Sequence, residues 1–155
     1  MKILFLDIDG VLAPFSNNYK FVCQHILPDG CLMFEPSCVA ELNYICEATK
    51  ASIVITSSWR FYIKDLELMR TMFREQGVDA PIIGMTPQLT TTRGDEIKNF
   101  LELTDGSPYV IVDDADMGFV GLEDRWVQPD CKIGLTAKDS RKIIQLLGEN
   151  YERRS

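Results

Sequence analysis

The sequence predicts an α/β fold with a doubly wound, mostly parallel sheet that carries helices on both faces. Three short apolar runs, at residues 2–6, 52–55 and 109–112, each end in polar residues. A short continuous apolar run is typical of a parallel strand that is buried on both faces and has no solvent side. Helical patterns lie between the runs and after the last one. Strands that alternate with helices in this way indicate right-handed crossovers and a parallel sheet.

The first strand is followed by an irregular segment and then by a helix. Residues 11–35 are rich in Pro, Asn, Gly and aromatic side chains and fit neither a strand nor a helix, so we expect a flap or hairpin there. Residues 36–48 form a helical pattern, with Pro36 near a favourable first-turn position. The apolar stripe of this helix consists of Val39, Leu42, Ile45 and Cys46.

Two further helices are expected between the second and third apolar runs. The pattern at 60–76 repeats apolar residues at helical spacing and stops at Gly77, a helix-ending glycine. We expect the interval 59–92 to hold this helix and a short strand. A shorter stripe follows Arg93-Gly94-Asp95 and contains Ile97, Phe100 and Leu101.

The last helix is expected to begin at Thr136, whose hydroxyl can cap it, with Asp139 in its first turn. It completes a single predicted domain at 1–150, and a tail follows at 151–155. A length of 155 residues supports one hydrophobic core of ordinary size.

The composition excludes several classes of protein. The chain is 46% hydrophobic and 25% charged, which is the globular average and excludes a disordered, collagen-like or coiled-coil chain. Its formal net charge of −7 argues against a protein that coats nucleic acid or an anionic membrane through bulk charge. A small basic groove is still compatible with this charge.

Cysteine usage and the short apolar runs predict a cytoplasmic protein. The five cysteines are odd in number and include no CxxC pair, which is typical of reduced thiols. The first run reaches Asp7 after four apolar residues, too few for a signal-peptide core or a membrane span. We therefore expect no membrane association, and nothing in the sequence indicates an obligate protein partner.

Polar residues follow all three predicted strands directly, at the edge where ligands bind in a doubly wound sheet. A single Asp or Ser in such a place usually caps a turn. All three strands end in this way, however, so we expect these residues to converge on a functional site if the strands are neighbours. They are Asp7, Asp9, Thr56, Ser57, Asp113 and Asp114.

The spacing of Asp7 and Asp9 points to a divalent cation. Residues two apart on an extended backbone point to the same side, so both carboxylates would share one crevice. A divalent cation removes the repulsion between them by neutralising both. Oxygen ligands alone favour Mg²⁺, and Gly10 lets the chain turn away sharply beside the site.

At these positions the chain resembles the haloacid dehalogenase (HAD) superfamily of phosphohydrolases. Asp7-Ile8-Asp9-Gly10-Val11-Leu12 looks like the DxDGxL nucleophile motif of that superfamily. Thr56-Ser57 resembles its second motif and Asp113-Asp114 its fourth, and the order agrees over residues 1–147. Three sequence segments are similar, more narrowly, to the small HAD domains of RNA-repair proteins: Thr56-Ser57-Ser58-Trp59-Arg60, Arg93-Gly94-Asp95-Glu96-Ile97 and Ile133-Gly134-Leu135-Thr136.

The resemblance implies a covalent mechanism. Asp7 would attack phosphorus to form an aspartyl-phosphate, which water then hydrolyses. Asp9 would protonate the leaving oxygen and later deprotonate the water. The carboxylates of Asp7 and Asp113 and the backbone carbonyl of Asp9 would hold Mg²⁺, and Asp114 would support the metal shell or orient the basic residue.

The resemblance also requires groups that bind the phosphoryl oxygens. Thr56 or Ser57 would donate a hydrogen bond, and Thr56 is favoured because it is the first polar residue after the strand. The superfamily commonly uses a lysine as its cation. Here Arg93 lies at the start of the helix where that lysine would sit, and an arginine fork can bind phosphate through two hydrogen bonds. Lys98, farther along the same helix, is the alternative.

Substrate size can be judged from the intervals where the superfamily often inserts a cap domain. Residues 11–51 and 59–92 are too short for one, and an open site admits a large substrate. Trp59 and Arg60 directly follow the second motif. They could line the entrance and contact the substrate, or Trp59 could pack against the flap.

The leading hypothesis is therefore a Mg²⁺-dependent phosphomonoesterase that acts on a nucleic-acid terminal phosphate or another large phosphorylated substrate. A phosphatase of small metabolites, such as nucleotides or sugar phosphates, and a non-enzymatic HAD-like binding module are the alternatives. A response-regulator receiver domain fits poorly, because its phosphoacceptor aspartate lies on the third strand, and here Thr56-Ser57 occupy that position.

Overall fold

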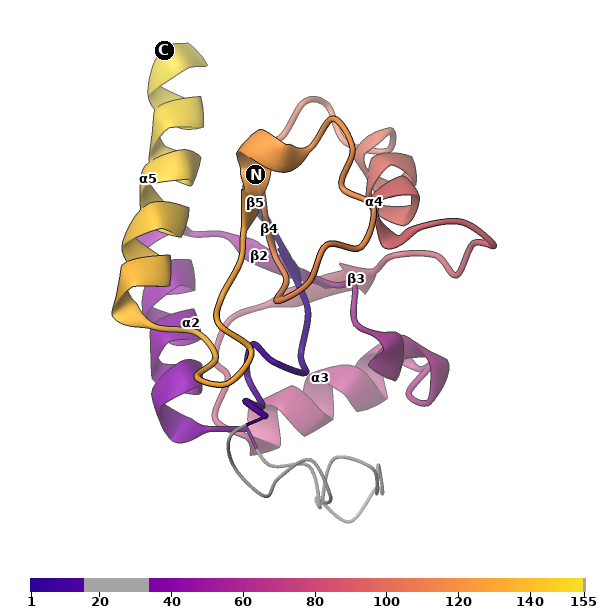
Figure 1. Ribbon diagram of the computed structural model, residues 1–155, viewed down its shortest axis with the longest axis vertical. Coiled ribbons are helices and arrows are strands. Elements are labelled where there is room, and N and C mark those ends of the chain that lie inside the picture. Colours follow the sequence, from indigo (N-terminus) through magenta and orange to yellow (C-terminus); the bar gives the residue numbers. More distant parts are fainter. Residues whose placement is uncertain (16–33, 155) are drawn as a thin grey trace.

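A parallel five-stranded sheet forms the centre of the molecule in the computed structural model, which describes residues 1–15 and 34–154 (Figure 1). The strand order is β3-β2-β1-β4-β5. The strands are β1 (Ile3–Leu6), β2 (Ser52–Ile55), β3 (Ile82–Met85), β4 (Tyr109–Val112) and β5 (Trp126–Val127). The helices are α2 (Pro36–Thr49), α3 (Leu66–Glu75), α4 (Arg93–Leu101) and α5 (Ala137–Arg154), with 3₁₀ turns η1 (Ser58–Phe61) and η2 (Glu123–Arg125). Most of the predicted flap at 11–35 lies outside the described residues.

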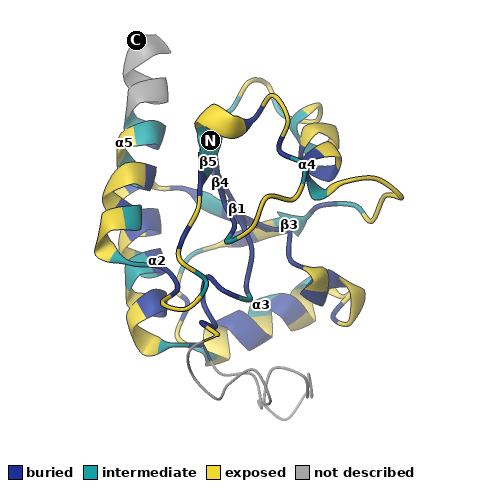
Figure 2. Ribbon diagram, in the orientation of Figure 1, coloured by how far each residue is buried: buried dark blue, intermediate teal, exposed yellow. Residues whose placement is uncertain are grey.

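Helices cover both faces of this sheet, as the sequence predicts. Side chains of α2, α3 and α5 pack on one face, in a core cluster that contains Leu4, Leu6 and Ile53. The opposite cluster contains Phe5 and Ile111 and is closed by α4 and the chain that follows β4. Figure 1 shows α2 and α5 together on one side of the strands and α4 on the other. Strand β1 is buried throughout, and β2 and β4 are buried except at their first residues, Ser52 and Tyr109 (Figure 2), which explains their continuous apolar sequences.

The predicted helix at 60–76 is divided in the structure. Residues 58–61 form η1, and α3 begins only at Leu66. The Oδ1 atom of Asp65 accepts hydrogen bonds from the backbone N–H groups of Glu67 and Leu68 at 2.8 and 3.2 Å. This side-chain cap satisfies donors that a helix start otherwise leaves free, so it sets a new beginning inside the apolar pattern. The chain leaves α3 through Gly77 at a φ of +92°, as predicted.

Two features near the carboxyl end of the chain differ from expectation. The two-residue strand β5 pairs with β4 and is too short to leave an apolar run in the sequence. Helix α5 continues through Arg154, so most of the expected tail at 151–155 is helical. The start of α5 agrees with the prediction, because the Thr136 hydroxyl accepts a hydrogen bond from the N–H of Asp139 at 3.4 Å.

Candidate active site

The register of the sheet brings three of the predicted polar residues to one level. Leu6, the last residue of β1, pairs with Ile55 of β2 and with Val112 of β4. The next residue along each strand is therefore Asp7, Thr56 or Asp113. Because β1 lies between β2 and β4, Asp7 is flanked by the other two at the carboxyl edge of the sheet.

Three carboxylates form a cluster at this edge. Asp7, Asp113 and Asp114 each place an oxygen within 4.8 Å of the other two. Gly10 makes room for them, because a Cβ at this position would lie 2.3 Å from Oδ2 of Asp114, and its φ of +80° disfavours other residues. The carboxylate of Asp9 is not part of the cluster.

Arg93 supplies the positive charge of the site. Its Nη1 donates a hydrogen bond to Oδ2 of Asp113 at 2.6 Å and lies 3.3 Å from Oδ1 of Asp7. Its Nη2 donates to the Ser58 hydroxyl at 3.3 Å. Arg93 is the first residue of α4, whose start is capped by the Thr92 hydroxyl. Lys98 is exposed on the same helix, so the geometry brings Arg93 and not Lys98 to the carboxylates.

Burial and mutual repulsion perturb the ionisation of this cluster. Burial raises the pKa of Asp7 well above its ordinary value, and the charge of Asp113 raises it further, while Arg93 partly opposes both. Burial likewise raises the pKa of Asp113, against the opposing charge of Arg93. For Arg93, burial alone would lower the pKa, but Asp7 and Asp113 outweigh it and the pKa is raised. Carboxyl groups held together in this way favour a cation between them.

Asp9 lies beside the cluster and is held by Trp59. The indole Nε1 of Trp59 donates a hydrogen bond to Oδ2 of Asp9 at 3.1 Å. Burial raises the pKa of Asp9, the Trp59 hydrogen bond opposes this shift, and the charge of Asp114 adds to it. Trp59 is 3% exposed and packs against Phe34, with the ring centroids 5.9 Å apart. It therefore does not line an open entrance, and its contact with Phe34 agrees with the alternative that it packs against the 11–35 segment.

The two hydroxyl residues after β2 have different environments. The Ser57 hydroxyl accepts a hydrogen bond from the backbone N–H of Trp59 at 3.2 Å and caps η1. Thr56 is fully buried, and its Oγ1 has no hydrogen-bond partner among the described residues. A buried hydroxyl without a partner is costly, so Thr56 is the better candidate to donate to a ligand at this edge.

Arg60 is a structural residue in this arrangement, contrary to the expectation that it contacts substrate. Its side chain is 5% exposed and forms a salt bridge with Glu96 of α4, with Nη2 and Oε1 3.0 Å apart. Its Nε donates to the Ser57 carbonyl at 2.8 Å, and its Nη1 donates to Thr86. The guanidinium thus ties η1 to α4 behind the site. No spacing in the sequence signals that Thr86 and Glu96 are its partners.

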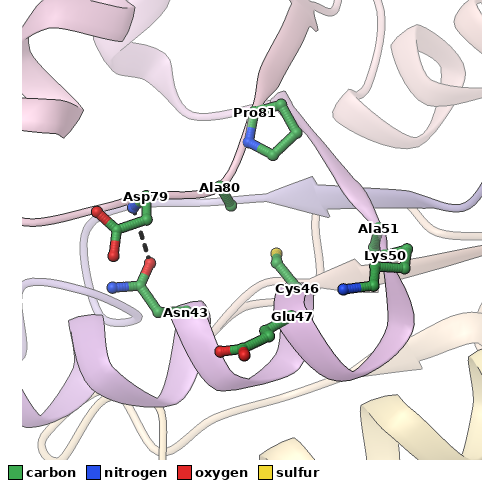
Figure 3. A pocket seen from close by; sticks show the side chains of 8 residues that line it. All are labelled: Asn43, Cys46, Glu47, Lys50, Ala51, Asp79, Ala80 and Pro81. Atoms are coloured by element: carbon green, nitrogen blue, oxygen red, sulfur yellow. Dashed lines mark hydrogen bonds between the residues drawn. The ribbon is translucent and has the colours of Figure 1, made fainter.

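A cavity of ≈ 370 Å³ lies away from this site (Figure 3). It is bordered by Asn43, Cys46 and Glu47 of α2 and by the segment 79–81 before β3. Its walls thus precede β2 and β3, whereas the carboxylate cluster follows the carboxyl ends of the strands. The Asn43 side chain is occupied in a hydrogen bond with the N–H of Asp79 at 2.9 Å. The residues that line this cavity do not form a cluster of catalytic or metal-binding side chains.

A family model described as the HAD domain in Swiss Army Knife RNA repair proteins matches residues 3–140. Neither a curated protein nor a solved structure matches the chain. Among the described residues, no helix is both long and apolar enough to cross a bilayer.

Proposed function

The chain belongs to the family of HAD domains in Swiss Army Knife RNA repair proteins, and from this premise we propose that it is a Mg²⁺-dependent phosphomonoesterase. The observation that carries the proposal is the convergence of Asp7, Asp113 and Asp114 with Arg93 at one edge of the sheet. Carboxylates next to a buried guanidinium suit the binding of a cation and a phosphoryl group together.

The donor set fits a hard divalent cation. The clustered oxygens come from carboxylates, and Mg²⁺ prefers one or two such ligands together with water and phosphate oxygen. Asp7 and Asp113 would hold the ion, with Asp114 beside it and the backbone carbonyl of Asp9 as a further ligand. Bound Mg²⁺ would neutralise charge on the phosphoryl oxygens. The unpartnered Thr56 hydroxyl at the same edge is consistent with a phosphoryl group as its missing partner.

The first chemical step follows from the residues around Asp7. A carboxylate oxygen of Asp7 attacks phosphorus, and the bond from phosphorus to the ester oxygen breaks. The leaving oxygen takes a proton from the carboxyl group of Asp9, whose raised pKa favours the protonated form. Arg93 and the Thr56 hydroxyl donate hydrogen bonds to the phosphoryl oxygens and stabilise the charge that develops on them.

The second step reverses these roles. Asp9, now a carboxylate, removes a proton from a water molecule as the water oxygen bonds to phosphorus. The bond from phosphorus to the Asp7 oxygen breaks and releases inorganic phosphate. Asp7 is regenerated as a carboxylate and Asp9 as an acid, so the cycle is balanced.

The family description supports a terminal phosphate of RNA as the substrate. That description refers to RNA repair proteins, and repair of broken strands requires removal of terminal phosphate monoesters. The interval 59–92 contains only η1, α3 and β3. It therefore holds no lid domain that would keep a polymer end out of the site. The net charge of −7 predicts recognition of a few terminal nucleotides rather than a long stretch of backbone.

Release of phosphate by the wild type and by an Asp7→Asn variant tests the proposal. We expect the wild type to hydrolyse phosphate esters in the presence of Mg²⁺ and Asp7→Asn to lose about 10³-fold or more in kcat, because the nucleophile is removed. Asp105→Asn makes the same change of charge at an exposed position and is the matched control. An Asp7→Asn variant as active as the control would show that Asp7 is not the nucleophile.

The substrate class is tested separately with a panel of phosphate esters. It contains oligoribonucleotides with 3′- or 5′-terminal phosphate, free nucleotides, sugar phosphates and phosphopeptides. We expect the highest kcat/KM for a terminally phosphorylated oligonucleotide. Turnover of small metabolites alone would reject the polymer end and favour the metabolite phosphatase. Binding of phosphorylated ligands without turnover would favour a binding module.

A further inference from the structure

The side chain of Trp59 is joined to the candidate active site by a hydrogen bond to Asp9. Its indole N–H donates to Oδ2 of Asp9 at 3.1 Å, and its side chain is withdrawn from solvent, with the residue 3% exposed. Among the described residues, no other side chain donates a hydrogen bond to the Asp9 carboxylate. A role for Trp59 in chemistry must therefore pass through Asp9 and not through direct contact with substrate.

The position of the indole is fixed independently of Asp9. The backbone N–H of Trp59 donates to the Ser57 hydroxyl at 3.2 Å, and its carbonyl accepts from the N–H of Ile63 at 2.8 Å. The ring packs on Phe34, which itself packs edge-on against Phe73 with centroids 5.1 Å apart. The ring thus belongs to the main core cluster and is a rigid reference point for Asp9.

Asp9, in contrast, lies on a turn after β1. The turn is closed by the backbone, through a hydrogen bond of 2.9 Å from the N–H of Gly10 to the Ala13 carbonyl. This bond fixes the backbone next to Asp9 but makes no contact with its carboxylate, whose orientation about the side-chain bonds needs a separate restraint. The hydrogen bond from Trp59 supplies this restraint. It occupies Oδ2 and leaves Oδ1 for proton exchange.

We propose that Trp59 is a positioning residue that aims the second oxygen of Asp9 at the leaving oxygen of the substrate. This inference rests on the proposed function. When Oδ1 gives its proton to the leaving oxygen, the bond from phosphorus to that oxygen breaks and negative charge appears on the Asp9 carboxylate. The Trp59 N–H then donates to this charged form, which strengthens the bond. The same orientation serves the second step, in which Asp9 takes a proton from water.

The proposal predicts a dependence on the leaving group that a purely structural role would not produce. A primary alkyl phosphate releases a strongly basic alkoxide, so bond cleavage requires a proton from an acid in the right place. p-Nitrophenyl phosphate releases a weakly basic phenolate that departs without a proton. The value of kcat/KM reports on the first step for both substrates. Misplacement of Asp9 should therefore slow the alkyl ester selectively.

The test compares Trp59→Phe with wild type on both esters. We expect kcat/KM for the alkyl ester to fall about tenfold or more, as part of the ~10²–10⁴-fold that general acid catalysis contributes, and for the aryl ester to fall less than about threefold. Asp9→Asn should show the same selectivity with a larger amplitude. Trp126→Phe is the matched control, because its indole N–H donates instead to the backbone carbonyl of Asp113 at 3.0 Å, and it should affect both esters equally.

The outcomes separate the inference from the function on which it rests. Equal losses on both esters for Trp59→Phe, beside a selective loss for Asp9→Asn, would overturn the positioning role and leave the phosphatase intact. The same selective loss in Trp126→Phe would also overturn it. A wild type that hydrolyses neither ester would reject the proposed function itself and the inference with it. If Trp59→Phe does not fold, benzothienylalanine at position 59 removes the indole N–H and keeps the shape of the ring. The inference then requires this variant to lose activity selectively on the alkyl ester.

Discussion

The environment of Thr56 indicates that this residue binds a ligand. It is fully buried and its hydroxyl has no partner among the described residues. An unmade hydrogen bond in the interior lowers stability by about 1–3 kcal/mol. A side chain that lowers stability and stands beside Asp7 is more easily understood as a binding group than as part of the core.

Replacement of Thr56 by Val is expected to stabilise the ligand-free protein and impair its activity. Val has nearly the same shape and lacks the unpartnered hydroxyl, so the free energy of unfolding should rise by about 1 kcal/mol. Loss of one donor to the phosphoryl oxygens should lower kcat by about 10²-fold. Denaturant unfolding and phosphate release measure the two effects.

Thr49→Val is the matched control for this substitution. Thr49 is also buried, but its hydroxyl donates to the Ile45 carbonyl at 2.7 Å and accepts from the N–H of Ala51 at 3.2 Å. Because Val leaves these groups unpaired, this variant should lose about 1–3 kcal/mol of stability. A Thr56→Val protein that is destabilised to the same extent would contradict the idea that its hydroxyl lacks a partner.

At the scale of elements, α4 must approach the chain after β4 closely enough to bring Arg93 to Asp113. Gly94 makes this approach possible, because a Cβ there would lie 2.0 Å from the carbonyl oxygen of Gly118. The N–H of Gly94 also donates to the Met117 carbonyl at 3.2 Å. The absence of a side chain next to Arg93 is thus a requirement of the docking of the helix.

Gly94→Ala is expected to push α4 away from this loop. Overpacking of this kind lowers the free energy of unfolding by about 1–3 kcal/mol. The displacement of Arg93 from the carboxylates should also lower phosphatase activity. Gly148→Ala is the control, because among the described residues no atom beyond the adjacent helix backbone lies within 4 Å of its added Cβ, and Ala gains about 0.5–1 kcal/mol over Gly in a helix. Thermal unfolding should therefore move in opposite directions for the two variants. A neutral Gly94→Ala would contradict the close packing.

The elements also show what sequence reasoning could and could not reach. The buried strands and the residues that follow them could be read directly, because a parallel strand has to be apolar on both faces and ligands gather at its carboxyl end. The division of the 60–76 pattern into η1 and α3 could not be predicted, because the apolar stripe and a cap at Asp65 indicate different starting points for the helix. The contacts of Trp59 and Arg60 were also out of reach, because the partners Asp9 and Glu96 lie far away in the chain and neither spacing nor composition connects them.

At the scale of the whole molecule, the carboxylate cluster is expected to link stability to pH and, through the proposed metal site, to Mg²⁺. The folded-state pKa values of Asp7 and Asp113 are raised, chiefly by burial, whereas the unfolded chain ionises them near their ordinary value of about 4. The folded state then binds more protons, so the stability that these groups contribute is present below about pH 4 and is lost as the pH rises through the raised pKa values.

Mg²⁺ should therefore raise the unfolding temperature more at pH 8 than at about pH 5, because protons compete with the ion for the same oxygens. A concentration of Mg²⁺ a hundredfold above its Kd stabilises by about 2.7 kcal/mol. Thermal unfolding with and without the ion measures the effect. The Asp113→Asn variant should lose this stabilisation by Mg²⁺, and the Asp105→Asn variant should keep it. A stabilisation by Mg²⁺ that does not depend on pH would show that the ion binds elsewhere.

The strand order β2-β1-β4 determines when the site can exist. Ile3 pairs with Tyr109, about a hundred positions later in the chain, and such long-range parallel pairing is slow to form. Because Asp113 and Asp114 follow β4, a nascent chain that ends before this strand has neither the carboxylates nor the partner that fixes Arg93. We therefore expect the nascent polypeptide to lack the proposed phosphatase activity until β4 docks. Recovery of activity during refolding would report completion of the sheet, not its onset.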